Sequence, residues 1–188
     1  MMTSELIELF LAGNQLKRTL RSGWVMRGVP NPEDVAAHSY GVSWIALTLA
    51  NPIQESAGIQ FDMGRLLAMA LIHDVPEGKT MDIPTPAWRI LPKGVKPDIE
   101  RGIMQQIVKG SSQNKYLIGL WEEMNSRESA ESKLVHDADK LDMYLQAWQY
   151  EKQFGNQNLA EFWENNHHFH FELSQQIYSK LRSLRRSI

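Results

Sequence analysis

Four side chains in this sequence have the types needed to bind a metal ion. They are two imidazoles and two carboxylates: His38, the adjacent pair His73-Asp74, and Asp139. Nitrogen and oxygen donors in this mixture suit a borderline-to-hard divalent cation. We therefore expect these residues to hold one divalent metal ion, whose identity the donor types restrict only to Mn, Co, Fe, Ni, Zn or Mg.

Each of these residues has a simpler interpretation when it is taken alone. His38 shares a helical face with Val35 and Val42, and a single histidine on an apolar face is more often a core residue than a ligand. Asp139 alone would be an exposed acid. Asp74 is harder to explain without a cation, because it ends an apolar helical stripe, where a carboxylate meets the negative end of the helix dipole.

The elements that must position these residues are helices. Helical periodicity recurs along the chain, whereas no segment alternates convincingly at the two-residue period of a strand. We predict an all-α fold of roughly six or seven helices, at about residues 4–20 (loosened at 13–14), 31–50, 62–73, 98–109, 115–125, 129–153 and 159–186.

Two boundaries follow from local chemistry, and one segment breaks the helical pattern. Asn31 has the features of an N-cap, with proline next, and the helix it starts is expected to stop before Asn51-Pro52. Asp62 is the expected cap of the third helix. Residues 76–97 hold five of the eight prolines, so they cannot form one regular helix. Such long connections are usually functional or disordered, and we expect an active-site loop here.

Composition restricts the class of protein. A chain of 188 residues with 43% hydrophobic and 22% charged residues is typical of one soluble globular domain. The formal net charge of -2 gives no basic field for polymeric nucleic acid. There is no cysteine, which excludes thiolate chemistry and disulfides. No apolar run is long enough for a membrane span and no signal peptide is evident, so we expect a cytoplasmic protein without a membrane partner.

The order His, His-Asp, Asp resembles the signature of the HD-domain metal-dependent phosphohydrolases. The surrounding sequence resembles one branch, the 5′-deoxynucleotidases, over about residues 16–152, with 153–188 expected as a helical extension that packs on a single HD domain (1–188). The resembling segments, as they stand here, are LKR at 16–18, RSGWVMR at 21–27, VAAHS at 35–39, HDVPE at 73–77, MDIPTP at 81–86 and VHDADKL at 135–141.

The resemblance implies the ligand set and an activity. It places the fourth ligand at Asp139 rather than at Asp137, which lies only two residues away. The implied reaction is metal-dependent hydrolysis of (deoxy)ribonucleoside 5′-monophosphates to nucleoside and phosphate, with deoxy substrates preferred. One departure is Ala37, where the family usually has an acid before the first histidine. We take that position to support the orientation of the ligand.

Roles for the remaining candidates follow from the same resemblance. Arg21 is the expected phosphate clamp, because a guanidinium binds phosphate oxygens bidentately; alone it would be a surface charge. Glu77 is the expected proton donor or water-orienting base, with Asp82 as an alternative base or sugar contact and otherwise a turn residue. Trp24 is the expected sugar or base platform, although most tryptophans are core residues. Thr85, in the same segment as Asp82, is a further expected substrate contact.

The sequence is also compatible with other functions. HD hydrolases that cleave cyclic dinucleotides often use extra histidines for a second metal, and this chain has none between Asp74 and His136. Alarmone hydrolases typically carry an acid pair after the His-Asp dipeptide, whereas Gly78 follows Glu77 here. A non-catalytic metal or nucleotide-binding regulator would keep the ligands without the other site residues. The histidines at 167–170 are expected on a surface helix or loop without a catalytic role, and a homodimer is possible.

Overall fold

The computed structural model describes residues 3–92, 94–164 and 166–187, and within these ranges the side chain of Thr85 is not described. In this part of the chain every regular element is a helix, and one isolated β-bridge joins Leu20 to Asp34. The helices, including two 3-10 helices (η), are α1 Thr3–Gln15, η1 Leu16–Arg18, α2 Ser22–Val25, α3 Val35–Ala57, α4 Met63–Ile72, α5 Glu77–Thr80, α6 Thr85–Ile90, α7 Val95–Ile107, α8 Asn114–Ser126, α9 Ala130–Phe154, η2 Gln157–Trp163 and α10 Glu172–Arg185.

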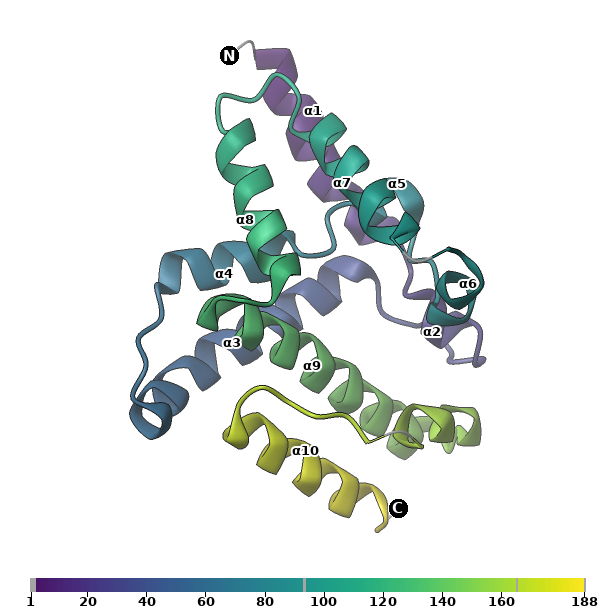
Figure 1. Ribbon diagram of the computed structural model, residues 1–188. Coiled ribbons are helices and arrows are strands. Elements are labelled where there is room, and N and C mark those ends of the chain that lie inside the picture. Colours follow the sequence, from purple (N-terminus) through teal and green to yellow (C-terminus); the bar gives the residue numbers. More distant parts are fainter. Residues whose placement is uncertain (1–2, 93, 165, 188) are drawn as a thin grey trace.

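The all-α class is therefore confirmed. Of the ten α-helices described, α2, α5 and α6 are single short turns, and the seven longer ones match the predicted six or seven. The long helices α3 and α9 pack against each other at the centre, α4 packs on both, and α10 lies along α9 (Figure 1). Helices α1, α7 and α8 stand together at the opposite end of the molecule (Figure 1).

The predicted N-cap of the second helix, Asn31, is wrong by three residues. Helix α3 begins at Val35, and its N-cap is Asp34, whose carboxylate accepts the Ala37 N–H at 2.8 Å. The reason is a long-range contact, because the Val35 N–H donates to the Thr19 carbonyl at 2.8 Å and the Arg21 N–H to the Glu33 carbonyl at 3.1 Å. This short antiparallel pairing keeps residues 31–34 extended or turned instead of helical.

The predicted end of that helix before Asn51-Pro52 is also wrong. Helix α3 continues through Pro52 to Ala57 and ends at Gly58 in the left-handed region, with φ 65°. Ala50 and Ile53 are buried in the core, whereas Pro52 faces solvent. Burial of the apolar face therefore outweighs the loss of one backbone hydrogen bond on the exposed side.

The segment predicted as one helix over 159–186 is divided. The 3-10 helix η2 ends at Trp163, and α10 begins only at Glu172. The connection is fixed by Asp137 of α9, whose carboxylate accepts the backbone N–H groups of His170 at 2.9 Å and Phe171 at 3.0 Å. Those groups cannot enter a helix while they bind Asp137, so helical periodicity alone misplaced the start of the last helix.

The proline-rich segment 76–97 forms no single helix, as predicted, but it is not irregular throughout. It holds α5, α6 and the first residues of α7, and it joins α4 to α7. Asp62 caps α4 as expected, because its carboxylate accepts the Arg65 N–H at 3.0 Å. No described helix is long and apolar enough to span a membrane.

The core has two parts that meet on α9. One contains α3 and α4 side chains such as Val42 and Leu66 together with Ala138, and the other contains Trp24 and Trp163 together with Leu141. Asp139 lies between Ala138 and Leu141 in the sequence, so its carboxylate emerges at the junction of the two parts. The fold thus places the predicted ligand of α9 where well-packed helices can hold it in position.

Candidate metal centre

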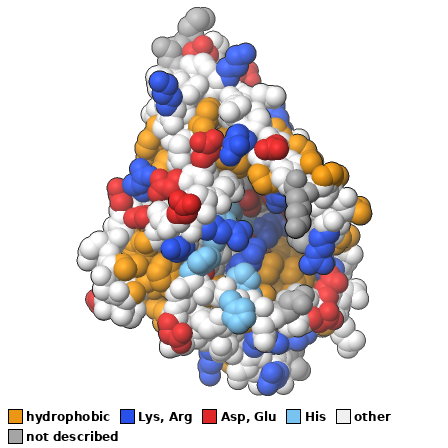
Figure 2. Space-filling model, viewed as in Figure 1, with side chains coloured by type: hydrophobic (Ala, Val, Ile, Leu, Met, Phe, Trp, Pro, Cys, Tyr) orange, Lys and Arg blue, Asp and Glu red, His pale blue; other side chains and the backbone are white. Residues whose placement is uncertain are grey.

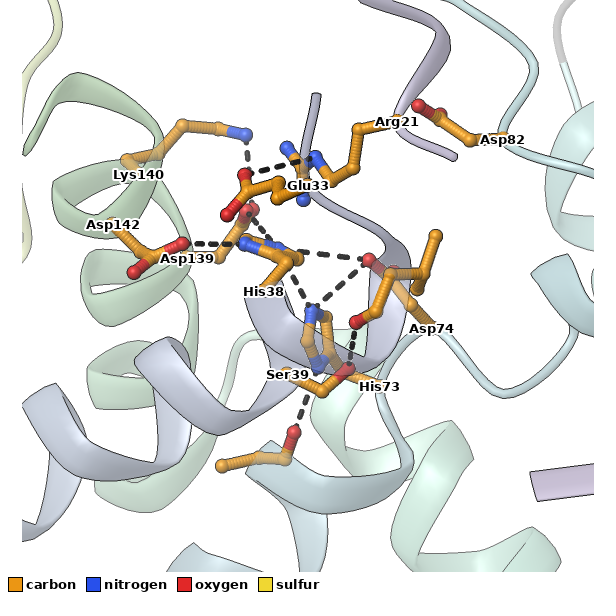
Figure 3. A network of polar contacts seen from close by, with 12 residues as sticks. Arg21, Glu33, His38, Ser39, His73, Asp74, Asp82, Asp139, Lys140 and Asp142 are labelled. Atoms are coloured by element: carbon orange, nitrogen blue, oxygen red, sulfur yellow. Dashed lines mark hydrogen bonds and ion pairs between the residues drawn. The ribbon is translucent and has the colours of Figure 1, made fainter. Parts of the chain in front are cut away.

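Three helices bring the four predicted ligands together (Figure 3). His38 lies in the first turns of α3, His73 is the C-cap of α4 with Asp74 next to it, and Asp139 is in the middle of α9. Both imidazoles are buried, whereas the Asp74 and Asp139 side chains are 24% and 21% exposed. The cluster is therefore closed on the histidine side and open on the carboxylate side.

The donor atoms converge on one small volume. His38 Nε2 is 3.4 Å from His73 Nε2, 3.3 Å from Asp139 Oδ1 and 3.7 Å from Asp74 Oδ2, and His73 Nε2 is 3.1 Å from Asp74 Oδ2. The donor atoms of His38, His73 and Asp74 all lie within 4.8 Å of one another. Asp139 approaches the same His38 nitrogen from α9 (Figure 3).

Each imidazole has its other nitrogen held by a neighbour. Nδ1 of His38 lies 2.7 Å from Asp142 Oδ2, and Nδ1 of His73 lies 2.7 Å from the Ala70 carbonyl oxygen. Both acceptors require a proton on Nδ1, which leaves the Nε2 lone pair of each ring for a cation. This hydrogen bonding of the outer nitrogen is characteristic of histidines that bind metals.

Electrostatics in the cluster favour a positive charge. Burial lowers the pKa of His73, but the charge and hydrogen bond of Asp74 outweigh burial and raise that pKa to about 9. Burial would raise the pKa values of Asp74 and Asp139, but His73 beside Asp74, and Lys140 and His38 beside Asp139, hold both below the usual range. The donor set, its geometry and its charge therefore fit a divalent cation.

A cavity of about 190 Å³ opens beside the carboxylates. Its lining brings together most of the predicted active-site side chains, namely Arg21, Trp24, Asp74, Glu77, Asp82 and Asp139. In the space-filling view, Lys, Arg and His side chains gather around a hollow near the middle of this face (Figure 2). The structure thus brings these six residues, from four separate segments of the chain, to one hollow.

Arg21 and Glu77 have different electrostatic surroundings within this cavity. Burial would lower the pKa of Arg21, but Asp139, Asp74 and Glu33 outweigh burial and raise that pKa, so the guanidinium stays charged. Burial, with the charges of Asp74 and Asp82, raises the pKa of Glu77 to about 10. A cation and a neutral carboxylic acid therefore face the same space at neutral pH.

The comparison with protein families identifies the family of the chain that carries this cluster. The sequence matches the HD domain over residues 13–179, which is most of the chain. The protein belongs to the HD-domain family. Proteins of this family are metal-dependent, and the His/Asp cluster of this chain is a possible metal-binding site.

Curated relatives of this HD-domain protein carry the name 5′-deoxynucleotidase. The sequence is 36% identical to the 5′-deoxynucleotidase HDDC2 of Danio rerio over 79% of this chain and 71% of the relative. It is 34% identical to the Dictyostelium discoideum protein of the same name, over 80% of each chain. The human protein of that name is 36% identical over 78% of this chain and 68% of its own length.

Solved structures agree with the HD-domain assignment. A crystal structure of a Pyrococcus horikoshii OT3 protein has 38% sequence identity and a TM-score of 0.76, covering 96% of this chain and 98% of its own. A conserved hypothetical protein from Pyrococcus furiosus gives a TM-score of 0.76 at 35% identity, covering 97% and 99%. An HD-domain phosphohydrolase from Listeria innocua, 19% identical with a TM-score of 0.66 over 95% and 79%, shares the fold.

The HD-domain sequence pattern did not reveal Asp142, which orients His38. Ala37, at the position predicted to support the first ligand, is exposed, and its N–H donates to the carboxylate of the N-cap Asp34. Support for the first ligand comes instead from Asp142 on another helix. Gly41 makes this contact possible, because a Cβ at that position would overlap the Asp142 carboxylate. The available signal was the spacing Asp139–Asp142, which places both acids on one helical face.

Glu33 is a second residue whose part in the site was not predicted. Its carboxylate accepts the Trp24 Nε1–H at 2.9 Å and lies 3.9 Å from Arg21 Nε. Its backbone N–H donates to the Tyr150 hydroxyl at 2.9 Å. Together with the backbone pairing of residues 19–21 and 33–35, these bonds fix Arg21 against the start of α3.

Trp24 and Asp82 occupy the cavity wall in ways that the sequence did not specify. The Trp24 side chain is only 1% exposed and packs against Phe162, with ring centroids 4.9 Å apart. Asp82 Oδ2 accepts the Ser22 N–H at 2.6 Å and so holds the start of α2. Their predicted substrate contacts stay predictions, and the side chain of Thr85 lies outside the described part of the chain.

Asp137 has a structural environment distinct from that of the cluster. Its carboxylate is buried, and it binds the His170 backbone N–H and Nδ1, both at 2.9 Å. The histidines at 167–170 thus lie in a connection anchored to α9, in agreement with a surface loop. The Asp137 carboxylate binds this loop, whereas the Asp139 carboxylate points to His38 (Figure 3).

Proposed function

We propose that this HD-domain protein is a metal-dependent phosphomonoesterase that hydrolyses nucleoside 5′-monophosphates, with deoxy substrates preferred. The observation that carries the proposal is one cavity lined by the Asp74 and Asp139 carboxylates, the Arg21 guanidinium and the neutral acid Glu77. The activity named for the curated relatives supports the same reaction.

The proposed ligands of one divalent ion are His38, His73, Asp74 and Asp139, because their donor atoms converge. In addition, the Nδ1 atoms of the two histidines are fixed by hydrogen bonds. When bound, such an ion supplies Lewis-acid charge for the phosphoryl oxygens and for a nucleophilic water. Among Mn, Co, Fe, Ni, Zn and Mg, this mixture of imidazole and carboxylate donors makes no further selection.

The protein groups supply binding, orientation and a proton. Arg21 would bind two phosphate oxygens, because its charge is fixed and its backbone is held by Glu33. As the water oxygen bonds to phosphorus and releases a proton to solvent, the P–O5′ bond breaks with its electron pair on O5′. Glu77, protonated at neutral pH, would give its proton to that oxygen and regain one from solvent.

The nucleoside would occupy the part of the cavity that carries aromatic and apolar side chains. Trp24, Phe162, Met143 and Ile83 line this part. Asp82 binds the Ser22 N–H through one carboxylate oxygen, and its other oxygen would accept from a sugar hydroxyl. The nearly buried Trp24 would limit the space beside the sugar. We further propose that residues 1–188 act as one HD domain with 153–188 as its extension; the predicted cytoplasmic location and homodimer stay predictions.

The test is phosphate release from a panel of deoxy- and ribonucleoside 5′-monophosphates. Metal-stripped protein would be assayed alone and with Mn, Co or Mg restored, with Asp139→Ala and Asp137→Ala in parallel. We expect metal-dependent release from deoxy substrates that is lost in Asp139→Ala and kept in folded Asp137→Ala. Absence of release from every monophosphate, with tight metal binding intact, would contradict the proposal and direct the search to cyclic dinucleotides, alarmones or a binding role.

A further inference from the structure

A second cavity adjoins the metal cluster. It has a volume of about 570 Å³, against about 190 Å³ for the cavity that holds Arg21. We call the cavity with Arg21 the nucleoside cavity and the larger one the rear cavity. Four side chains line both, namely Asp74, Lys96, Asp139 and Lys140. The carboxylates of the metal cluster therefore lie where the two cavities adjoin.

The two cavities differ in chemistry. Trp24 and Phe162 line the nucleoside cavity, whereas no described Trp, Tyr or Phe lines the rear cavity. The rear cavity is lined by four cationic side chains, Lys96, Arg101, Arg127 and Lys140, and by four carboxylates, those of Asp74, Glu100, Glu122 and Asp139. This lining offers no stacking platform for a base, and it can attract a small anion only at a cation that its carboxylates leave unpaired.

Arg127 differs from the other three cations. Lys96 pairs with Glu100 at 3.4 Å, Arg101 with Glu122 at 3.2 Å, and Lys140 with Asp139 at 2.9 Å. Arg127 has no carboxylate partner among the described residues, and its Nε–H donates to His136 Nε2 at 3.2 Å. That bond uses one edge of the guanidinium, so the terminal nitrogens remain available to a phosphate group.

The backbone at Arg127 supports a specific role. This residue ends α8 with φ 57° and ψ 30°, a left-handed conformation in which glycine or asparagine is usual. A long cationic side chain at such a position is unfavourable for the backbone, and such conformations cluster at functional sites. The position directs the chain from α8 to α9 beside the cluster and brings the guanidinium to the rear cavity.

We propose that the rear cavity binds inorganic phosphate as the departing product, with Arg127 as its cationic contact. This inference rests on the proposed function. In an in-line displacement the attacking water and O5′ lie on opposite sides of phosphorus. With the nucleoside in its own cavity, water arrives from the rear cavity, and inversion at phosphorus moves the phosphate oxygens toward that side. Phosphate then leaves past Arg127 while the nucleoside leaves on the other side.

The test measures binding of inorganic phosphate to the metal-loaded, full-length protein by isothermal titration calorimetry. We expect Arg127→Asn and Arg127→Gly, whose new residues both accept the left-handed backbone, to raise the phosphate Kd about tenfold through loss of a charge-assisted contact. The KM for the nucleoside monophosphate should change less than twofold. Lys115→Asn, the same charge change at an exposed position of α8 outside both cavities, is the matched control and should leave the phosphate Kd unchanged.

A variant of the nucleoside cavity completes the test. Phe162→Leu should raise the KM for the nucleotide and leave the phosphate Kd unchanged. The proposal is overturned if folded Arg127 variants bind phosphate as tightly as the original protein, or if phosphate Kd and nucleotide KM rise in step. Because calorimetry needs no turnover, Arg127-dependent phosphate binding without any nucleotide hydrolysis would reject the proposed function and leave the phosphate site standing.

Discussion

At the residue scale, His38 is held more firmly than any sequence pattern indicates. Its ring is fully buried. Among the described residues, the carboxylate that contacts its Nδ1 is that of Asp142, which lies on α9, about a hundred residues later in the sequence. Gly41, one turn further along α3, leaves room for that carboxylate. The orientation of the first ligand therefore depends on a contact between α3 and α9.

We expect Asp142→Ala to weaken divalent-metal binding by about 10- to 100-fold, because His38 loses the group that fixes its ring and its tautomer. Calorimetric titration with Mn²⁺ measures the effect. The matched control is Asp137→Ala, which removes another buried carboxylate of α9 and should leave the metal affinity unchanged. Equal metal affinity in Asp142→Ala and the original protein would exclude this role for Asp142.

Gly41→Ala should destabilise the protein, because the new methyl group meets the Asp142 carboxylate. In the Asp142→Ala background the same substitution should cost much less, since the overlapping group is gone. A double-mutant cycle on the free energy of unfolding measures the difference. Identical costs in the two backgrounds would mean that Gly41 is required for another reason.

His136 predicts a pH dependence of stability. Burial, with the nearby Arg127 charge, lowers its pKa from 6.5 to about 4. Between these two values the unfolded chain binds more protons than the folded protein, so stability falls as the pH drops through that window. We expect the loss of unfolding free energy between pH 7.5 and pH 5 to be smaller in His136→Gln. His168→Gln, at an exposed position, should retain the full loss in denaturant titrations.

At the scale of elements, α3 shows how tertiary packing overrides a local helix breaker. Ala50 and Ile53, on either side of Pro52, are buried against the first part of the core. The proline faces solvent, so the missing hydrogen bond lies where water can replace it.

We expect Pro52→Ala to raise the free energy of unfolding by about 1 to 3 kcal/mol, because the alanine restores a backbone donor in a helix interior. Chemical denaturation measures the change. Glu55→Ala, at an exposed position of the same helix, is the control and should have little effect. A destabilised Pro52→Ala protein would mean that the proline restricts the unfolded chain more than it disturbs the helix.

Elements defined by their own sequence were predictable, and those defined by contacts were not. Asp62 caps the helix that follows it directly, and the apolar stripe of α4 correctly placed His73 at a helix end. The start of α3 depends on backbone pairing with residues 19–21, and the start of α10 depends on Asp137. Neither contact produces a periodic pattern in the sequence from which it could be predicted.

The candidate site divides in the same way. Imidazoles and carboxylates are recognisable by type as candidate ligands, and the family resemblance selected His38, His73, Asp74 and Asp139 among them before the fold was known. The residues that position them, Asp142 and Glu33, are ordinary acids until α3 and α9 are packed together. The near-complete burial of Trp24 also depends on Phe162, which follows the segment of family resemblance.

At the scale of the whole molecule, a metal ion bound only by the folded state stabilises that state by mass action. At a free metal concentration about 100 times Kd, the gain is about 2.7 kcal/mol. We expect Mn²⁺ to raise the Tm of chelator-treated protein, with no increase in Asp139→Asn and the normal increase in Asp137→Asn. Thermal melts with and without the metal test this, and an unchanged increment in Asp139→Asn would remove Asp139 from the ligand set.

The cluster also joins α3, α4 and α9 at a single point, although α5, α6, α7 and α8 lie between α4 and α9 in the sequence. A cation that bridges these helices acts as a reversible cross-link among three distant stretches of chain. Amide hydrogens near His38, His73 and Asp139 should then exchange with solvent at a common, slower rate once the ion is bound. The amide hydrogens of α1 and α10, which contribute no metal ligand, should exchange as before. One bound ion would thus divide the molecule into a centre that opens slowly and ends that open independently.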